Sequence, residues 1–206
     1  MEMFLLIDKS CLITFLISYI INYLLELFYY YTEYIQEYME KVNIVLGRFQ
    51  PFTVGHLKCC TNVYKSRGLR TVLCVIDTTK TDEKHPFLTK LMWSGLKGLV
   101  RDYEEIADIV LVKNADILKI GEALASHGYS CATWSCGTDR YTAYKNMCKK
   151  YAPEVEVIEI HRDDSDVSPS QVRKAIQDGK EDQFKELTPK SMHKLYTQFK
   201  DALEAL

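Results

Sequence analysis

The stretch Gly47-Arg48-Phe49-Gln50-Pro51-Phe52-Thr53-Val54-Gly55-His56-Leu57 decides the fold of this chain. It follows Val42–Leu46, a β-branched run that is typical of a buried strand. It precedes apolar residues at helical spacing between Leu57 and Tyr64. A strand, a glycine-containing turn and a helix start, in this order, form the anion-binding corner of open α/β folds. The stretch therefore predicts such a fold, with a phosphate site where the helix begins.

Two glycines and a histidine indicate what this corner does. Gly47 lets the backbone come close to a ligand, and Gly55 leaves space beside His56 at the helix start. From there His56 can donate to a phosphate oxygen on which negative charge develops. The alternative is a plain strand–loop–helix junction. We favour the phosphate site, because glycine, proline, arginine and histidine all fall where phosphate chemistry needs them.

The same residues carry a family resemblance. Thr53-Val54-Gly55-His56 resembles the (His/Thr)-x-Gly-His motif of the nucleotidylyltransferase superfamily. The longer stretch from Gly47 to Phe52 is most similar to the archaeal-type nicotinamide mononucleotide (NMN) adenylyltransferases. Those enzymes usually carry histidine where this chain has Thr53, whereas phosphopantetheine adenylyltransferases carry threonine there. The resemblance implies catalytic roles for Thr53 and His56. It implies nucleotide binding by Gly47, Arg48, Phe49, Gly55 and His56.

A second motif lies near the C-terminus. Val167-Ser168-Pro169-Ser170-Gln171-Val172-Arg173 resembles the family's Ile-Ser-x-(Thr/Ser)-x-x-Arg motif. Ser168 suits an N-cap and Pro169 the first helical position, so a helix should start here. Ser170 and Arg173 can then both reach an anion at the helix N-terminus. We expect Ser168, Ser170 and Arg173 to bind the nucleotide and Arg173 to act in catalysis. Taken alone, the motif also fits an ordinary helix cap.

A third motif, Gly137-Thr138-Asp139-Arg140, resembles the family's Gly-(Ser/Thr)-Asp segment. The resemblance places Gly137, Asp139 and Arg140 at the nucleotide. Asp139 can accept from ribose hydroxyls or base amines, and Arg140 can pair with a phosphate. An ordinary turn with a surface ion pair is the alternative.

Two residues are candidates for the acceptor side of the site. Lys84 follows the second predicted strand, where related enzymes often place a phosphate-binding cation. Trp134, near the end of a later strand, can stack on a base or a nicotinamide ring. The alternatives are a solvated charged loop and a core tryptophan.

From Met39 onward the chain alternates between strand and helix patterns. The expected strands are Val42–Leu46, Thr71–Ile76, Asp108–Val112, Ser130–Ser135 and Val155–Ile160. The expected helices between them are Gly55–Arg67, Phe87–Tyr103, Ala115–His127 and Tyr141–Tyr151, and further helices follow at 169–178, 180–187 and 189–205. The fold class is therefore α/β: a Rossmann-like open parallel sheet of about five strands, with helices on both faces and a C-terminal helical appendage.

Residues 1–38 form a separate, apolar N-terminal extension to the domain at 39–206. Within it, Cys11–Tyr31 is long enough to span a bilayer, but no basic region or cleavage site marks a secretory signal. The extension fits a single-pass anchor, a helix packed on the domain or another subunit, or translation from an upstream start. We favour the last, since Met39 directly precedes the first strand.

Composition narrows the class of protein. The 206 residues carry a net charge of −2 and no Lys/Arg-rich tract, which argues against nucleic-acid binding. Seven cysteines without Cys-x-x-Cys spacing give neither a zinc site nor an even disulfide framework. We expect reduced thiols in a cytoplasmic protein and no metal ligands from the chain itself.

The resemblance implies a specific reaction. It implies an adenylyltransferase-type enzyme that transfers AMP from ATP to a phosphate-bearing acceptor such as NMN, in NAD biosynthesis. Pyrophosphate leaves, Mg²⁺ accompanies the triphosphate, and we expect a homo-oligomer. Two alternatives in the same class are a phosphopantetheine adenylyltransferase and a CTP-dependent cytidylyltransferase. The alternative from another class is a non-catalytic nucleotide-binding regulator, tethered to a membrane if residues 11–31 are a real anchor.

Overall fold

The computed structural model describes residues 9–161 and 166–206, with the side chains of 9–12 and 31–37 left aside. The described chain divides into two compact units, with the boundary after Met39. The first contains a single helix, α1 (Lys9–Tyr38). Within α1, Ile13–Tyr30 is long and apolar enough to cross a membrane, and none of this segment is buried. The second unit, Glu40–Leu206, contains the sheet and the other helices.

The sheet has five strands, and all of its pairings are parallel. Its order is β3-β2-β1-β4-β5, which confirms the predicted Rossmann-like architecture. The strands are β1 (Glu40–Gly47), β2 (Thr71–Ile76), β3 (Ile106–Val112), β4 (Tyr129–Gly137) and β5 (Glu156–Ile160). The chain winds outward from β1 to β3 and then returns to the other side of β1. This reversal makes the β1/β4 boundary the place where such sheets bind ligands.

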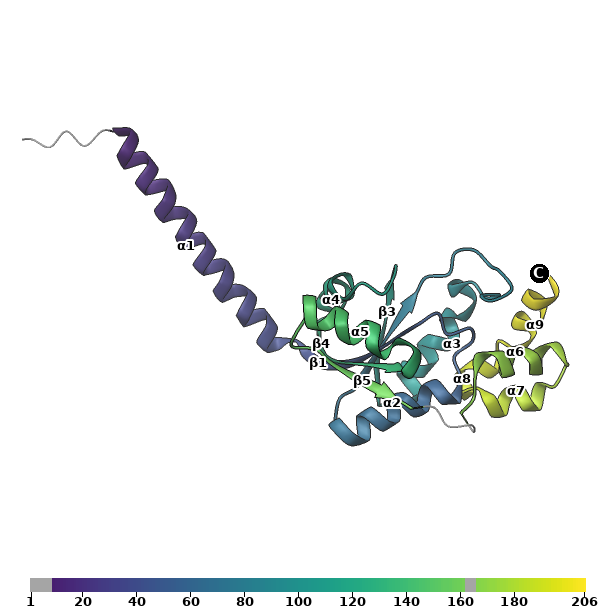
Figure 1. Cartoon of the computed structure of the whole chain (residues 1–206). Helices are drawn as coiled ribbons and strands as arrows, with labels where there is room; N and C mark the ends of the chain where they lie inside the picture. Colours follow the sequence, from purple (N-terminus) through teal and green to yellow (C-terminus); the bar gives the residue numbers. More distant parts are fainter. Residues whose placement is uncertain (1–8, 162–165) are drawn as a thin grey trace, which may run out of the picture. The chain divides into compact units, whose positions relative to one another are not determined.

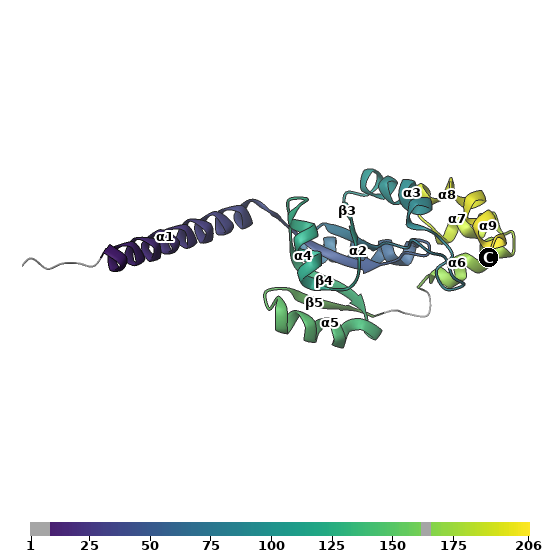
Figure 2. The same ribbon diagram turned by 90° about the horizontal axis from the view of Figure 1, so that it is seen from above.

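Helices cover both faces of the sheet (Figures 1 and 2). The connecting helices are α2 (Val54–Arg67), α3 (Thr89–Asp102), α4 (Ile117–Ala125) and α5 (Thr138–Tyr151). One apolar core joins the sheet to α2, α3 and the C-terminal helices, and the other joins its opposite face to α4 and α5. The C-terminal helices are α6 (Pro169–Gln177), α7 (Glu181–Leu187), α8 (Lys190–His193) and α9 (Tyr196–Glu204).

The last predicted helix is two helices. The prediction of one helix over 189–205 is wrong, because the chain turns between α8 and α9. Close packing on α3 explains the turn: a Cβ at Gly95 would lie 2.6 Å from the Met192 sulfur, and one at Gly98 would lie 2.6 Å from the Ser191 Cβ. The turn lets Met192 and Phe199 both be fully buried. In one straight helix through 189–205, part of this packing would be lost.

The central strand carries one buried polar side chain that ties it to both neighbours. The Asn43 amide nitrogen donates to Thr71 Oγ1 on β2 at 3.0 Å. Its oxygen accepts from Thr133 Oγ1 at 2.8 Å and Ser135 Oγ at 2.7 Å, both on β4. Because a buried polar group is costly unless it is satisfied, this network favours one pairing of β1 with β2 and β4.

Candidate functional site

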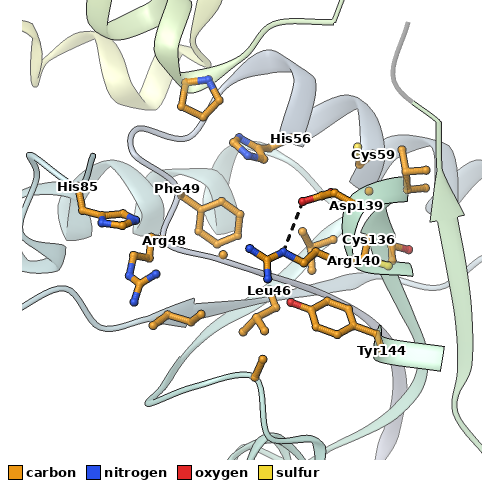
Figure 3. A pocket seen from close by; sticks show the side chains of 18 residues that line it. Leu46, Arg48, Phe49, His56, Cys59, His85, Cys136, Asp139, Arg140 and Tyr144 are labelled. Carbon is orange, nitrogen blue, oxygen red and sulfur yellow. Dashed lines mark ion pairs between the residues drawn. The ribbon is translucent and has the colours of Figure 1, made fainter. Parts of the chain in front are cut away.

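A cavity of about 390 Å³ lies at the carboxyl ends of the strands. Its wall is built from the ends of β1, β2, β4 and β5, the starts of α2, α5 and α6, and the loops before α3 and α4 (Figure 3). The charged and polar side chains that line it are those of Arg48, His56, His85, Ser135, Asp139, Arg140 and Tyr144. Segments far apart in the sequence therefore meet at the edge that the sheet topology predicts for a ligand.

The start of α2 holds His56 in one orientation. Thr53 is the N-cap, and the two residues form a capping box. The Thr53 backbone N–H donates to His56 Nδ1 at 3.0 Å, while the His56 N–H donates to Thr53 Oγ1 at 3.3 Å. Because Nδ1 accepts a hydrogen bond, the neutral ring carries its proton on Nε2. His56 lines the cavity as a hydrogen-bond donor that needs no positive charge.

Glycines and aromatic rings fix the surroundings of this histidine. The rings of Phe49 and Phe52 both pack on the His56 imidazole, each with centroids 5.2 Å away. Phe49 has a φ of 47°, a strained backbone for a bulky residue. A Cβ at Gly55 would lie 2.7 Å from the Val167 carbonyl oxygen. Gly55 therefore lets α2 approach the segment before α6, where any side chain would separate them.

The second motif lies next to the first through direct hydrogen bonds. Thr53 Oγ1 donates to the Val167 carbonyl at 3.3 Å. Ser168 is the N-cap of α6, in a capping box with Gln171, and Pro169 lines the cavity. The predicted helix start is thus confirmed, and it faces the same cavity as His56.

Arg173 lies one turn into α6 and bridges two segments. Its Nη1 donates to the Gln50 carbonyl at 2.7 Å, and its Nη2 donates to Ser170 Oγ at 3.2 Å. Partial burial lowers the pKa of the Arg173 guanidinium. The group stays charged, because the usual pKa of arginine is far above neutral pH. Neither Ser170 nor Arg173 is among the residues that line the cavity, and the hydrogen bonds of Arg173 connect the two motifs. The contact of both residues with an anion stays a prediction.

The third motif also reaches the cavity. Gly137 is the N-cap of α5, and Asp139 and Arg140 follow in its first turn. Arg140 Nε lies 3.4 Å from an Asp139 carboxylate oxygen, and both side chains are more than 60 % exposed. They pair with each other across an open surface and remain accessible to a ligand.

Trp134 does not lie where we expected it. Its side chain is fully buried, so stacking of this ring on a ligand is contradicted by the structure. The ring instead stacks on Tyr144 of α5, with centroids 4.0 Å apart and an interplanar angle of 22°. Tyr144 lines the cavity, and burial raises the pKa of its hydroxyl. The aromatic surface offered to a ligand is therefore Tyr144, backed by Trp134.

The loop before α3 presents a different residue from the predicted one. Lys84 is exposed and is not among the residues that line the cavity, whereas its neighbour His85 is. Sequence reasoning considered Lys80, Lys84 and His85 in this loop and selected Lys84, and it did not identify Tyr144 as a site residue. The signal for His85 was its place after the second strand and before Pro86-Phe87.

Comparisons with known proteins agree with this fold. No protein-family model and no curated protein sequence matches the chain. Solved structures do match. One, from Vibrio parahaemolyticus and named as a candidate nicotinate-nucleotide adenylyltransferase, is 12 % identical with a TM-score of 0.57, over 81 % of this chain and 97 % of that one. At 12 % sequence identity, this comparison shows a similar fold and no more.

Two further structures are of a Plasmodium falciparum nicotinic acid mononucleotide adenylyltransferase. In complex with APC it is 14 % identical with a TM-score of 0.50, and in complex with NaAD it is 13 % identical with a TM-score of 0.53. Each comparison covers 79 % of this chain and 97 % of that one. The chain therefore has the fold of nicotinate-nucleotide adenylyltransferases. The similarity to the archaeal NMN type stays a prediction from the motifs.

The described residues of the site differ in what they could offer a metal ion or an anion. Within residues 9–161 and 166–206, no group of three His, Cys, Asp or Glu side chains is placed to hold a metal ion. Among these described residues, Asp139 is the carboxylate that lines the cavity. The cavity also contains the thiol of Cys136, whose pKa burial raises to about 11, so it is protonated at neutral pH. The described groups of the site are suited to binding and orienting anions.

Proposed function

We propose that this protein is an adenylyltransferase that transfers AMP from ATP to a phosphate-bearing acceptor. NMN is the leading acceptor, and its nicotinate analogue is the second. The observation that carries the proposal is the capping box at α2, in which His56 Nδ1 accepts from the Thr53 backbone, beside a cavity flanked by two helix starts. The fold of nicotinate-nucleotide adenylyltransferases supports it.

The reaction needs positioning more than acid–base chemistry. A phosphate monoester is already a nucleophile at neutral pH, so its oxygen can attack the α-phosphorus of ATP without a general base. One P–O bond forms, and the bond to the departing pyrophosphate breaks. His56 and the positive ends of the α2 and α6 helix dipoles stabilise the charge on the α-phosphate. Arg48 and Arg140, both exposed residues that line the cavity, add positive charge around the phosphates.

Mg²⁺ fits this proposal as a companion of the triphosphate. When bound, the ion neutralises phosphate charge. Among the described residues, Asp139 is the carboxylate that lines the cavity and would be the ligand from the chain, and phosphate oxygens and water would be the others. The contribution of the chain is to orient the two substrates and to donate hydrogen bonds to them.

The test is pyrophosphate release from the full-length protein in the presence of Mg²⁺. ATP and CTP are each paired with NMN, nicotinate mononucleotide and phosphopantetheine. We expect turnover with ATP and at least one of the two mononucleotides. The Glu83→Gln variant, which changes an exposed residue of the loop before α3, serves as the matched control and should retain full activity. Turnover only with CTP, only with phosphopantetheine, or with no pair at all would overturn the proposal.

A further inference from the structure

The loop between β2 and α3 is held firmly against the cavity. The Gln50 side-chain amide pairs with the Phe87 backbone in both directions, donating to its carbonyl at 2.7 Å and accepting from its N–H at 2.8 Å. At the other end of the loop, the Thr78 N–H donates to Thr89 Oγ1 at 2.7 Å. Gln50 is 5 % exposed, so these bonds are shielded from water. Residues 78–87 therefore present His85 to the cavity from a fixed frame.

His85 is paired with a carboxylate. The Asp82 carboxylate lies 3.2 and 3.3 Å from His85 Nδ1, and it accepts from the His85 backbone N–H at 2.6 Å. This pairing lowers the pKa of Asp82, chiefly through the hydrogen bond from the imidazole. The His85 side chain is only 25 % exposed, and it lines the cavity. The Asp82 carboxylate thus fixes which ring nitrogen of His85 is used within the loop.

The two cavity histidines therefore present the same nitrogen, Nε2, in opposite protonation states when their rings are neutral. His56 accepts at Nδ1 and is a donor at Nε2 even when neutral. His85 donates from Nδ1 to a carboxylate, so its Nε2 carries a lone pair when the ring is neutral and a proton only when the ring is charged. A neutral His85 therefore repels an anion at Nε2, and a protonated His85 binds one.

The topology indicates which substrate lies on this side. His85 follows β2, whereas Asp139 and Arg140 follow β4, and these two strands flank β1 on opposite sides. In Figure 3 the Phe49 ring separates His85 and Arg48 from Asp139 and Arg140. The β4 side also adjoins β5 and the α6 start, which together suit a nucleoside triphosphate. The β2 side is left for the acceptor.

Resting on the proposed function, we propose that protonated His85, oriented by Asp82, binds an anionic oxygen of the acceptor together with Arg48. Among the described residues, the other titratable and charged groups that line the cavity are Cys59, His56, Cys136, Asp139, Arg140 and Tyr144. On its own loop His85 is flanked by Asp82, Glu83 and Lys84. Since the Nε2 of His85 donates only when the ring is charged, acceptor affinity should fall as pH rises. ATP affinity should not follow the same course.

The anion can be the phosphate of the acceptor or a carboxylate on its ring. Nicotinate mononucleotide carries both groups, whereas NMN carries the phosphate and a neutral amide. Acceptor Kd is therefore measured by calorimetric titration with each compound at several pH values, for the full-length protein and its variants. Comparison of variants at one pH removes the effect of the acceptor's own phosphate titration.

His85→Gln keeps the size of the side chain and removes its charge. We expect the acceptor Kd at pH 6 to rise roughly tenfold, as for loss of one hydrogen bond to a charged group, with no rise at pH 8. An equal rise for both mononucleotides assigns the contact to the phosphate, and a rise for nicotinate mononucleotide alone assigns it to the carboxylate. An unchanged Kd for both compounds would overturn the proposal.

Asp82→Asn tests the orientation of the ring. The asparagine amide can donate to Nδ1, which moves the proton of the neutral ring to Nε2. Acceptor binding should then lose its pH dependence, while Glu83→Gln, which removes the same charge one residue away, should keep it. A wild-type pH dependence in Asp82→Asn would overturn the proposal. The proposed function is tested separately by the pyrophosphate-release assay, and it would be wrong if the wild-type protein released no pyrophosphate.

Discussion

Two segments of the cavity wall each present a histidine, and they hold it by different means. The α2 start, residues 53–56, fixes His56 through backbone hydrogen bonds within one helical turn. The loop at residues 82–85 fixes His85 through a carboxylate, and the loop itself depends on Gln50. The first arrangement is local in sequence, and the second depends on a residue from another segment.

The difference shows that the partner of Nδ1 decides whether the Nε2 of a neutral histidine donates or accepts a hydrogen bond. With a backbone N–H as the partner of Nδ1, the Nε2 of His56 is a donor whether the ring is neutral or charged, which suits stabilisation of a transition state. A carboxylate partner gives His85 a charge-dependent contact, which suits recognition of a bound anion. We therefore expect changes at residues 53–56 to lower kcat and changes at residues 82–85 to raise the acceptor KM.

The largest expected effect comes from His56→Ala. We expect kcat to fall by roughly 10²–10³, as for the loss of one donor to the transition state, with little change in ATP binding. Steady-state pyrophosphate release and an ATP titration measure the two quantities. His85→Gln in the same assays should raise KM with kcat nearly unchanged. Near-wild-type turnover in His56→Ala would remove the contrast between the two histidines.

The next effect comes from Arg173→Ala. This change removes the bond to the Gln50 carbonyl and the positive charge beside the α6 start. We expect ATP to bind roughly tenfold more weakly, because a charged hydrogen-bond donor is lost, and AMP to be affected less. Ser170→Ala, which removes only the Ser170 hydroxyl that accepts from Arg173, should show the same preference with a smaller loss. Titrations with ATP and AMP measure this, and equal losses for both nucleotides would mean that the outer phosphates are not involved.

Gln50→Leu tests whether the loop really depends on another segment. The change leaves the Phe87 N–H and carbonyl without their buried partners, at a cost of about 1–3 kcal/mol in the free energy of unfolding. Thermal melts measure this loss. We also expect a higher acceptor KM with a smaller change in ATP affinity, since His85 loses its frame and the α6 start does not. A variant with reduced stability but an unaltered acceptor KM would show that the position of His85 does not depend on Gln50.

The smallest effect is expected for a protein that begins at Met39. Neither histidine-bearing segment lies in residues 1–38, and the chain divides into compact units at this boundary. We expect the shortened protein to be soluble, with wild-type kcat, KM and melting temperature. Membrane fractionation of both forms tests whether α1 acts as an anchor, in which case only the full-length chain would sediment with membranes. Aggregation or loss of activity of the shortened form in the absence of membranes would show that the domain needs α1.

Much of the fold could be predicted because its signals are local. The strand at Thr71–Ile76 lies where the hydrophobic pattern indicates, and the helix starts at Thr53 and Ser168 have the capping residues that the motifs suggest. The split of the last helix could not be predicted in this way. It depends on Gly95 and Gly98 of α3, which lie almost a hundred residues earlier in the chain.

The sequence by itself determined the alternation of strands and helices, the two helix starts and the presence of a histidine at one of them. Each of these depends on side chains and backbone groups within a few residues of one another. Only the tertiary structure decided that His85 rather than Lys84 lines the cavity, and that Trp134 lies behind Tyr144. It also decided that Arg173 binds the carbonyl of Gln50, 123 residues away. These outcomes depend on which segments the sheet brings together, and long-range packing leaves no local pattern in the sequence.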